Sequence, residues 1–163
     1  MAKFDIGRGI DDYIAQLGNL ADTSKDAVGR AVYEGAKVVA DAIKKEIGAI
    51  PVDDHPPIVA NGNRIGTLTS KQKQGLVDGF GIAKMKDEGG YKNVKIGFAG
   101  YNTEVTKKYP NGQPNAMIAR SVNSGTSFRK KNPFVDKTTR SVKSQAEEAM
   151  RKTVDEEISK RIK

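Results

Sequence analysis

The stretch Asn123-Ser124-Gly125-Thr126-Ser127-Phe128-Arg129-Lys130-Lys131-Asn132-Pro133-Phe134 lies between a short element and the longest helix that the sequence predicts. Asn123 and Gly125 tolerate the left-handed backbone that closes a helix or a turn. Asn132 offers an N-cap side chain, and Pro133 suits the first helical position because it has no amide proton to leave unpaired. We therefore predict that a basic loop is followed by a helix whose first core residue is Phe134.

The helix predicted after this stretch carries apolar residues at every fourth position, namely Val142, Ala146, Met150, Val154, Ile158 and Ile162. Four residues advance about 400° around an α-helix, so this apolar stripe turns by about 40° at each step. We expect Phe134, Val142 and Ala146 to lie in the core, and Ile158 and Ile162 to face a neighbouring subunit. The outer face pairs each acid with a base four residues later, the favourable order, at Glu147–Arg151, Glu148–Lys152, Glu156–Lys160 and Glu157–Arg161.

Two more helices are predicted near the N-terminus. The first is short, and its apolar positions are Ile10, Tyr13, Ile14, Leu17 and Leu20. The second begins at Thr23, because Thr23 and Asp26 have the spacing of a capping box. Its apolar and small residues follow one side from Ala27 to Ile47, and Gly48 and Pro51 end it. Since that side is rich in Ala, Gly and Val, the backbone can approach its partner closely, and we expect the partner to be a sheet face.

The centre of the chain predicts an antiparallel hairpin. Phe80, Ile82, Ala83 and Met85 indicate one strand, and Val94, Ile96 and Phe98 alternate with polar residues or glycine in the next. The turn residues Asp87-Glu88-Gly89-Gly90 lie between them. We expect an antiparallel sheet of three to four strands around this hairpin.

Short helices are predicted on either side of the hairpin. Thr69 or Ser70 can cap a brief helical turn before it. After a polar loop over residues 101–114, Met117, Ile118 and Val122 favour a short helix opened by Pro114. Ile118, Arg120 and Val122 would also alternate as a strand, although we favour the helix.

Residues 49–68 contain many prolines, glycines and asparagines and show no hydrophobic period. A loop of this length is usually functional or disordered, so we expect this loop to be flexible. Within it, Asp53-Asp54-His55 resembles a metal cluster at first sight. Three adjacent residues rarely converge on one ion, however, and the sole histidine is expected to be an ordinary solvated residue.

Composition limits the possible classes. A chain of 163 residues is long enough for one α+β domain, and we expect a single domain over 1–163 built from the antiparallel sheet, two long helices and short helices. With no cysteine, a disulfide scaffold and a thiol nucleophile are excluded. No apolar run approaches the roughly 20 residues that cross a bilayer, so no membrane association is expected.

The strongest candidate site in the sequence is a basic cluster of Arg129, Lys130, Lys131, Lys137, Arg140 and Lys143. Such a cluster can bind phosphates or remain an ordinary solvated surface. No paired carboxylates, metal-ligand set or nucleophile with a base is visible, so we expect no catalysis, no cofactor and no small-molecule substrate. A small basic nucleic-acid-binding protein is the alternative function.

An Ala-rich short element, a Gly-Thr pair, polar residues, Pro-Phe and a long C-terminal helix follow one another from Ala116 onward. This order resembles the tail-completion, or head–tail joining, proteins of long-tailed double-stranded DNA bacteriophages, with further support from Gly97-Phe98-Ala99-Gly100-Tyr101-Asn102. An acidic residue often precedes the Gly-Thr pair in that family, whereas this chain has Asn123, which puts any charge contact at that position in doubt.

The resemblance implies a structural protein of a phage or prophage virion, made in the host cytoplasm and found in the tail or neck. It implies a ring, commonly a hexamer, that contacts other tail or connector proteins and lets DNA pass. Subunit contacts are then expected at Gly125, Thr126, Ile158 and Ile162. The basic cluster would make weak, sequence-independent contact with DNA or would meet an acidic partner.

Overall fold

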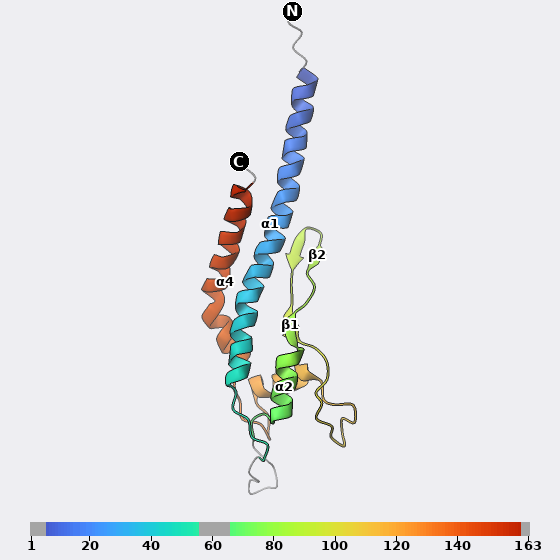
Figure 1. Ribbon diagram of the computed structural model, residues 1–163, viewed down its shortest axis with the longest axis vertical. Coiled ribbons are helices and arrows are strands. Elements are labelled where there is room, and N and C mark those ends of the chain that lie inside the picture. The colour runs from blue at the N-terminus through green and yellow to red at the C-terminus, as the bar shows by residue number, and fades with distance from the viewer. Residues whose placement is uncertain (1–5, 56–65, 161–163) are drawn as a thin grey trace, which may run out of the picture.

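The computed structural model describes the backbone of residues 6–55 and 66–160, and the side chains of residues 24–55 and 66–160. The elements in chain order are α1 (Ile6–Ala49), α2 (Ser70–Gly79), β1 (Phe80–Ile82), β2 (Lys86–Glu88), β3 (Tyr91–Asn93), β4 (Ile96–Phe98), α3 (Asn115–Ser124) and α4 (Phe134–Ser159). The predicted α+β class is confirmed. In Figure 1, α1 runs along the long axis, between α4 on one side and the strands on the other.

The first two predicted helices form one helix, α1, of 44 residues. The prediction of a new helix at Thr23 is therefore wrong. Thr23 and Asp26 have the spacing of a capping box, but the same residues fit a helix interior when no proline or other breaker stops the backbone hydrogen bonds. The predicted C-terminal end at Gly48 is confirmed, because α1 ends at Ala49.

The small-residue side of α1 packs mainly against α4 rather than against a sheet. At the closest approach, a Cβ atom added to Gly35 would lie 2.1 Å from Cε of Met150. Ala31, Ala36 and Ile43 of α1 and Ala146 of α4 are buried. The close approach of the α1 backbone to its partner was thus predicted correctly. The partner itself was predicted wrongly, because small residues allow a helix to pack as closely as a sheet.

The predicted hairpin is confirmed, although it forms two small sheets. β1 pairs with β4 in the register Phe80↔Phe98 and Ile82↔Ile96, and β2 pairs with β3 around the turn at Gly89 and Gly90. Both pairs are antiparallel and two-stranded. The expected sheet of three to four strands is not formed in the described residues, where the polar loop after β4 contributes only the isolated bridge Tyr101↔Pro114.

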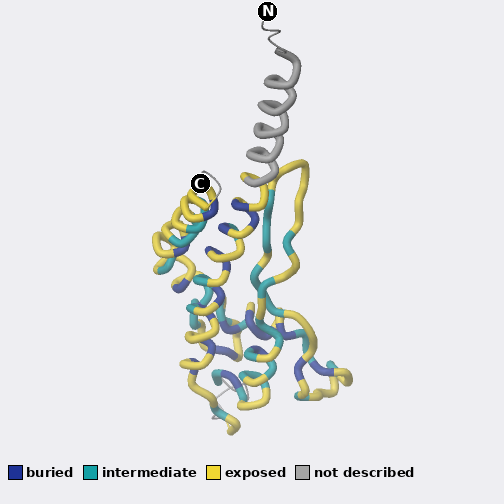
Figure 2. The backbone as a smooth tube through the Cα atoms, turned by 45° about the horizontal axis from the view of Figure 1, so that its top comes forward, coloured by how far each residue is buried: buried dark blue, intermediate teal, exposed yellow. Residues whose placement is uncertain are grey.

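The main core lies where α2, α3, the hairpin and the first turns of α4 meet the C-terminal half of α1. Figure 2 shows buried positions at this end and along one side of α1. Phe98 links two aromatic contacts, with its ring centroid 4.9 Å from that of Phe80 and 6.2 Å from that of Phe134. Phe134 is 2% exposed, which confirms it as a core residue.

The junction between α3 and α4 confirms the predicted end of α3, but Pro133 precedes α4 instead of being its first residue, and the predicted cap is not formed. Gly125 ends α3 with φ of +77°, as expected for glycine, and α4 begins at Phe134. Pro133 occupies the N-cap position without a capping side chain, so the prediction of Asn132 as the cap is wrong. Instead, Oδ1 of Asn123 accepts hydrogen bonds from the backbone N–H of Val135 at 3.1 Å and of Asp136 at 3.4 Å.

Both flanks of the predicted flexible loop pack into the fold. Ile50 and Leu68 are buried, and Val52 forms a bridge with Leu68. Thr69 caps α2 through a capping box with Gln72, which confirms the predicted helix start. The rest of the loop, 56–65, lies outside the described residues. No helix in the described part of the chain is long and apolar enough to span a membrane.

Candidate functional site

Two contacts fix how α1 and α4 lie against each other. Nη1 of Arg30 donates a hydrogen bond to Oε2 of Glu157 at 2.6 Å, and Gly35 lies against Met150. As residue numbers rise on α1 they fall on α4, so the two helices are antiparallel. The end of α4 at Ser159 therefore lies near Val28, and the first part of α1 continues past it, as Figure 1 shows.

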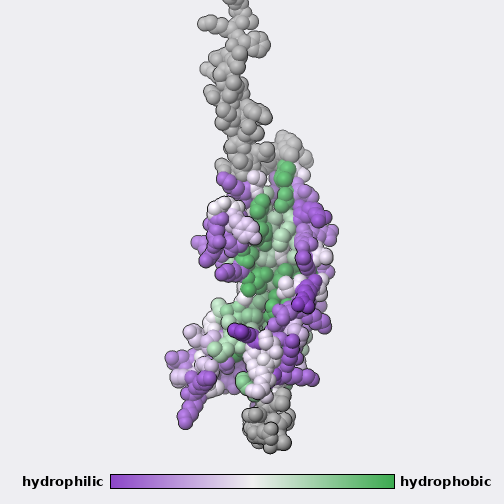
Figure 3. All heavy atoms as spheres, turned by 180° about the vertical axis from the view of Figure 1, so that it is seen from behind, coloured by the Kyte–Doolittle hydropathy of each residue, from purple (hydrophilic) through white to green (hydrophobic). Residues whose placement is uncertain are grey.

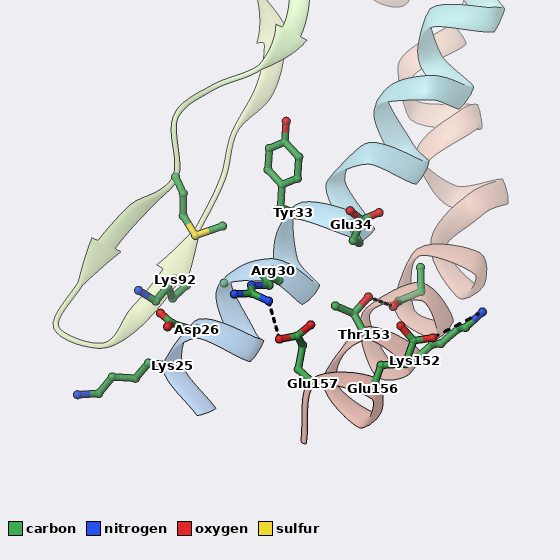
Figure 4. A pocket seen from close by; sticks show the side chains of 13 residues that line it. Lys25, Asp26, Arg30, Tyr33, Glu34, Lys92, Lys152, Thr153, Glu156 and Glu157 are labelled. Carbon is green, nitrogen blue, oxygen red and sulfur yellow. Dashed lines mark hydrogen bonds and ion pairs between the residues drawn. The ribbon is translucent and has the colours of Figure 1, made fainter. Parts of the chain in front are cut away.

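One face of α1 forms a charged groove between α4 and the hairpin. The groove has a volume of about 830 Å³, and its walls include Tyr33 of α1, Met85 and Lys92 of the hairpin, and Ala149 and Thr153 of α4. Figure 4 shows Arg30 and Glu157 pointing toward each other across one side of it. The groove is open and lined by both signs of charge, so it resembles a polar contact surface more than an enclosed ligand pocket.

Glu157 of α4 does not lie where the sequence analysis predicted it. We predicted it on the outer face, paired with Arg161, but it is 8% exposed and accepts hydrogen bonds from Lys160 at 2.9 Å and from Arg30. These bonds, that from Lys160 first, lower the pKa of Glu157 from its usual value, while burial opposes them. The other ion pairs along α4 also differ from those predicted. Among the described residues, Lys143 pairs with Glu147 and Lys152 pairs with Glu156, so the base precedes the acid in each pair.

A second open face of α1 is apolar. Val28 is 42% exposed, and Val32, four residues further along the same side, is half-buried. On α4, Ile158 is 38% exposed and Val154 is half-buried. The antiparallel register places Val28 level with Ile158. We name Val28, Val32, Val154 and Ile158 the apolar face.

The apolar face does not belong to the groove. With about 100° between successive helical residues, Val28 and Val32 point away from Gly29 and Tyr33, and Val154 and Ile158 point away from Ala149 and Thr153. The view from behind in Figure 3 shows a hydrophobic stripe along the long axis between hydrophilic margins. Ile158, which is 38% exposed, lies on an open surface of α4. That it meets a neighbouring subunit stays a prediction, and Ile162 lies outside the described residues.

Five of the six residues in the predicted basic cluster are exposed, namely Lys130, Lys131, Lys137, Arg140 and Lys143. Lys131, Lys137 and Arg140 line one shallow hollow together with Asp136. Lys137 also borders a second hollow beside Lys45 of α1. The exposed basic surface therefore includes a lysine from α1 that the sequence analysis did not connect to it.

Arg129, the sixth residue, is buried inside the fold. It is 9% exposed, and its Nη2 donates a hydrogen bond to Oε1 of Gln72 at 2.8 Å. Its backbone pairs with Gly66 and with Thr126. Burial lowers the pKa of the Arg129 guanidinium from its usual value, and the nearby Glu104 carboxylate raises it. Arg129 therefore holds the basic loop to α2 and is not displayed to a partner.

Arg129 belongs to a network of polar side chains around the start of α2. Thr69 donates a hydrogen bond to Glu104, and Asn102 donates to the backbone oxygen of Lys71 at 3.1 Å. Among the described residues, Nη1 of Arg129 and Oδ1 of Asn115 are buried without a hydrogen-bond partner. No local sequence pattern indicates this network, because its members come from distant loops and meet only in the folded chain.

The remaining candidate residues, Gly125, Thr126 and Asp54, contact other parts of their own chain. The backbone N–H of Thr126 donates to the carbonyl of Arg129 at 2.9 Å, and a Cβ added to Gly125 would lie 2.9 Å from Cβ of Lys131. In the part of the chain that the structure describes, Asp54 and His55 do not form a metal-ligand group. The carboxylate of Asp54 accepts hydrogen bonds from the N–H and hydroxyl of Ser70, which lower the pKa of Asp54, the backbone bond first.

Long helices with uncovered apolar and charged faces define an α+β protein whose described surface offers contact areas for other macromolecules. A family model described as "Bacteriophage HK97-gp10, putative tail-component" matches residues 11–125. The chain therefore belongs to this HK97-gp10-like family of phage tail components. The predicted phage resemblance is confirmed at this level. No curated protein matches the chain, and neither does any solved structure.

The family match and the sequence resemblance rest on partly different residues. The match ends at Gly125, so it includes the short helix α3 but neither the basic loop nor α4. The apolar face is formed half by matched residues of α1 and half by unmatched residues of α4. Membership of a tail-component family makes the chain a component of the phage virion that contacts other phage proteins.

Proposed function

We propose that this tail component is a structural subunit that completes the tail or joins it to the head, and that it does so as a ring, commonly a hexamer. Its role is to bind other proteins rather than to catalyse a reaction. It is made in the host cytoplasm and then takes its place in the tail or neck of the phage or prophage particle. The observation that carries this proposal is the apolar face formed by Val28, Val32, Val154 and Ile158.

This face supports assembly because a contiguous apolar patch between polar margins is typical of a protein–protein contact site. A ring of identical subunits needs a head-to-tail contact, in which one surface meets a different surface of the next copy. The exposed basic residues Lys130, Lys131, Lys137, Arg140 and Lys143 would attract passing DNA weakly or meet an acidic partner ring.

The test is to inactivate the gene in the phage or prophage that encodes it and to examine the particles by electron microscopy. We expect DNA-filled heads and complete tail tubes that remain separate, because the missing subunit acts after both are built. Supplying the chain in trans should restore joined particles. Joined particles with tails of irregular length would instead indicate a role in ending tail growth, and complete infectious particles would contradict the proposal.

A small nucleic-acid-binding protein remains the second candidate, favoured by the five exposed basic residues alone. It predicts tight or sequence-selective binding by the isolated protein, which a joining ring would avoid because tight binding would hinder DNA passage. Salt dependence separates the two, since contacts made only to phosphates weaken steeply as salt rises.

A further inference from the structure

Two shallow hollows lie side by side on the first turns of α4, and Lys137 and Ser141 border both of them. The hollow between α4 and α1 is also lined by Lys45, and the hollow toward the basic loop is lined by Lys131 and Arg140. Because the hollows share two residues, they form one continuous trough from α1 across α4 to the loop. We name Lys45, Lys131, Lys137 and Arg140 the basic trough.

The four cations of the basic trough are available to an external anion. All four side chains are exposed. In the described part of the chain, no ion pair engages any of them, whereas Lys143 of the same helix pairs with Glu147 at 3.8 Å. The carboxylates of Glu46 and Asp136 also line the hollows, and that of Asp136 accepts a hydrogen bond from the Asn123 side chain at 2.9 Å. With four basic and two acidic side chains, the trough is positive.

The apolar lining of the trough is too small to anchor a protein partner. It consists of Ala42, Val142 and Pro133, and the large apolar residues that are exposed in the described chain lie elsewhere. Protein–protein contacts are centred on buried aromatic or large apolar side chains. Binding of single-stranded nucleic acid relies on aromatic side chains that stack on bases. The trough offers neither, so its chemistry fits the charged backbone of a duplex.

We propose that the basic trough binds the phosphate backbone of double-stranded DNA, with Lys45 and Lys137 at one hollow and Lys131 and Arg140 at the other. Contacts of lysine and arginine with phosphates release bound counterions but carry no sequence information. The contact is weak and independent of sequence, which suits DNA that has to move past it. This inference rests on the proposed ring through which DNA passes, and it names the residues that face the DNA, including Lys45 of α1.

The first experiment measures binding of the purified chain to a fluorescently labelled duplex of random sequence, by anisotropy over a series of sodium chloride concentrations. Lys45→Gln removes one cation, so we expect it to reduce the slope of log affinity against log salt by about 0.9 for each copy on the duplex. Lys44→Gln is the matched control, because Lys44 is also exposed on α1 but lies outside both hollows, and it should keep the parental slope. Lys45→Arg keeps the charge and should also keep the slope. Equal slopes for Lys45→Gln and Lys44→Gln overturn the proposal.

The second experiment asks whether the two hollows act as one site. Lys45→Gln/Lys137→Gln and Lys131→Gln/Arg140→Gln each neutralise two cations, and each should reduce the slope by about 1.8 for each copy on the duplex. Both variants should keep the parental melting temperature, because exposed charges contribute little to stability. A slope that falls for only one of the two variants would contradict a single continuous site.

A competition experiment separates DNA from an acidic protein. Polyglutamate and unlabelled duplex are added as competitors at the same concentration of charge. DNA carries one charge per roughly 1.7 Å of its axis and an extended polypeptide at most one per roughly 3.3 Å, so we expect the duplex to displace the labelled DNA at lower concentration. Equal displacement by polyglutamate would overturn the assignment to DNA and favour an acidic protein.

Failure of this inference is distinguishable from failure of the proposed function. A parent chain that does not bind the duplex even at low salt but restores joined particles in trans would overturn the DNA contact and leave the joining role in place. A parent chain that binds the duplex through Lys45 but restores nothing would do the reverse.

Discussion

Asn123 shows how one side chain can join two helices. It lies in the last turn of α3, where its Oδ1 accepts from the first amides of α4 and its Nδ2 donates to Oδ2 of Asp136 at 2.9 Å. An amide can do both because it carries an acceptor and a donor. An aspartate at this position could accept but could not donate.

This geometry predicts different outcomes for two substitutions. Asn123→Ala should lower the free energy of unfolding by about 1 kcal/mol, the usual cost of a lost N-cap. Asn123→Asp keeps an acceptor but places its carboxylate against that of Asp136, so it should also destabilise at pH 7. Its deficit should shrink in acid, because protonation of the introduced carboxyl removes the repulsion.

The control is the exchange variant Asn123→Asp/Asp136→Asn, which moves the amide from α3 to α4. Urea unfolding at pH 7 should show that the exchange recovers most of the stability that Asn123→Asp loses. If the exchange is as unstable as the single variant, the hydrogen bond between the two side chains contributes nothing. A deficit of Asn123→Asp that does not depend on pH would argue against charge repulsion.

Only part of this junction could be predicted from sequence. Gly125 and Phe134 follow from local chemistry, since a glycine can end a helix and an aromatic after proline can begin the next one. The cap could not be predicted, because Asn123 and Val135 are 12 residues apart and meet only when α3 packs beside α4. Arg129 illustrates the same limit, since nothing in a run of three basic residues indicates that the first one is buried.

At the scale of elements, the existence of each helix was easier to predict than its partner. Hydrophobic spacing identified most of α1, but Thr23 and Asp26 favoured a break that the continuous helix overrides. The hairpin followed from its turn and its alternation. The number of strands did not, because it depends on whether a distant loop pairs with an edge, and residues 101–114 form only an isolated bridge.

The packing of α1 on α4 gives a prediction at Gly35. Gly35→Ala places a methyl group against Met150, and such overpacking costs about 1–3 kcal/mol, partly offset by up to about 1 kcal/mol of helix propensity. We expect a net loss of about 1 kcal/mol. Gly48→Ala is the matched control in the same helix, because no atom lies within 4 Å of its added Cβ, and it should be neutral or stabilising.

Thermal and urea unfolding of both variants measure this difference. A second comparison isolates the cause, since in a Met150→Ala background the change Gly35→Ala should become neutral or stabilising. If Gly35→Ala is as stable as Gly48→Ala in the parent chain, then Met150 moves aside freely and the close approach does not limit stability. A loss that persists without Met150 would place the strain elsewhere in the helix pair.

At the scale of the whole molecule, the charges are distributed unevenly along α4. Its first turns carry Lys137, Arg140 and Lys143 close to Lys130 and Lys131, whereas the C-terminal half carries Glu147, Glu148, Asp155, Glu156 and Glu157. The exposed basic surface is therefore confined to the start of α4 and the loop before it, and does not simply reflect the net charge of +8. Because Arg129 is buried against Gln72, substitution of Arg129 would disturb the fold and must be left out of any test of this surface.

The last prediction concerns this surface, through the variant Lys130→Gln/Lys131→Gln/Lys137→Gln/Arg140→Gln. The matched control, Lys84→Gln/Lys86→Gln/Lys95→Gln/Lys107→Gln, removes the same charge from other exposed positions. Each phosphate contact contributes about 0.9 to the slope of log affinity against log salt, so the first variant should lose DNA retention at low salt and the control should keep it. Both should keep their melting temperature, because exposed charges contribute little to stability. The yield of joined particles should fall only for the first variant. Equal yields would remove this surface from the joining role, and salt-resistant DNA binding by the parent chain would favour the nucleic-acid-binding alternative.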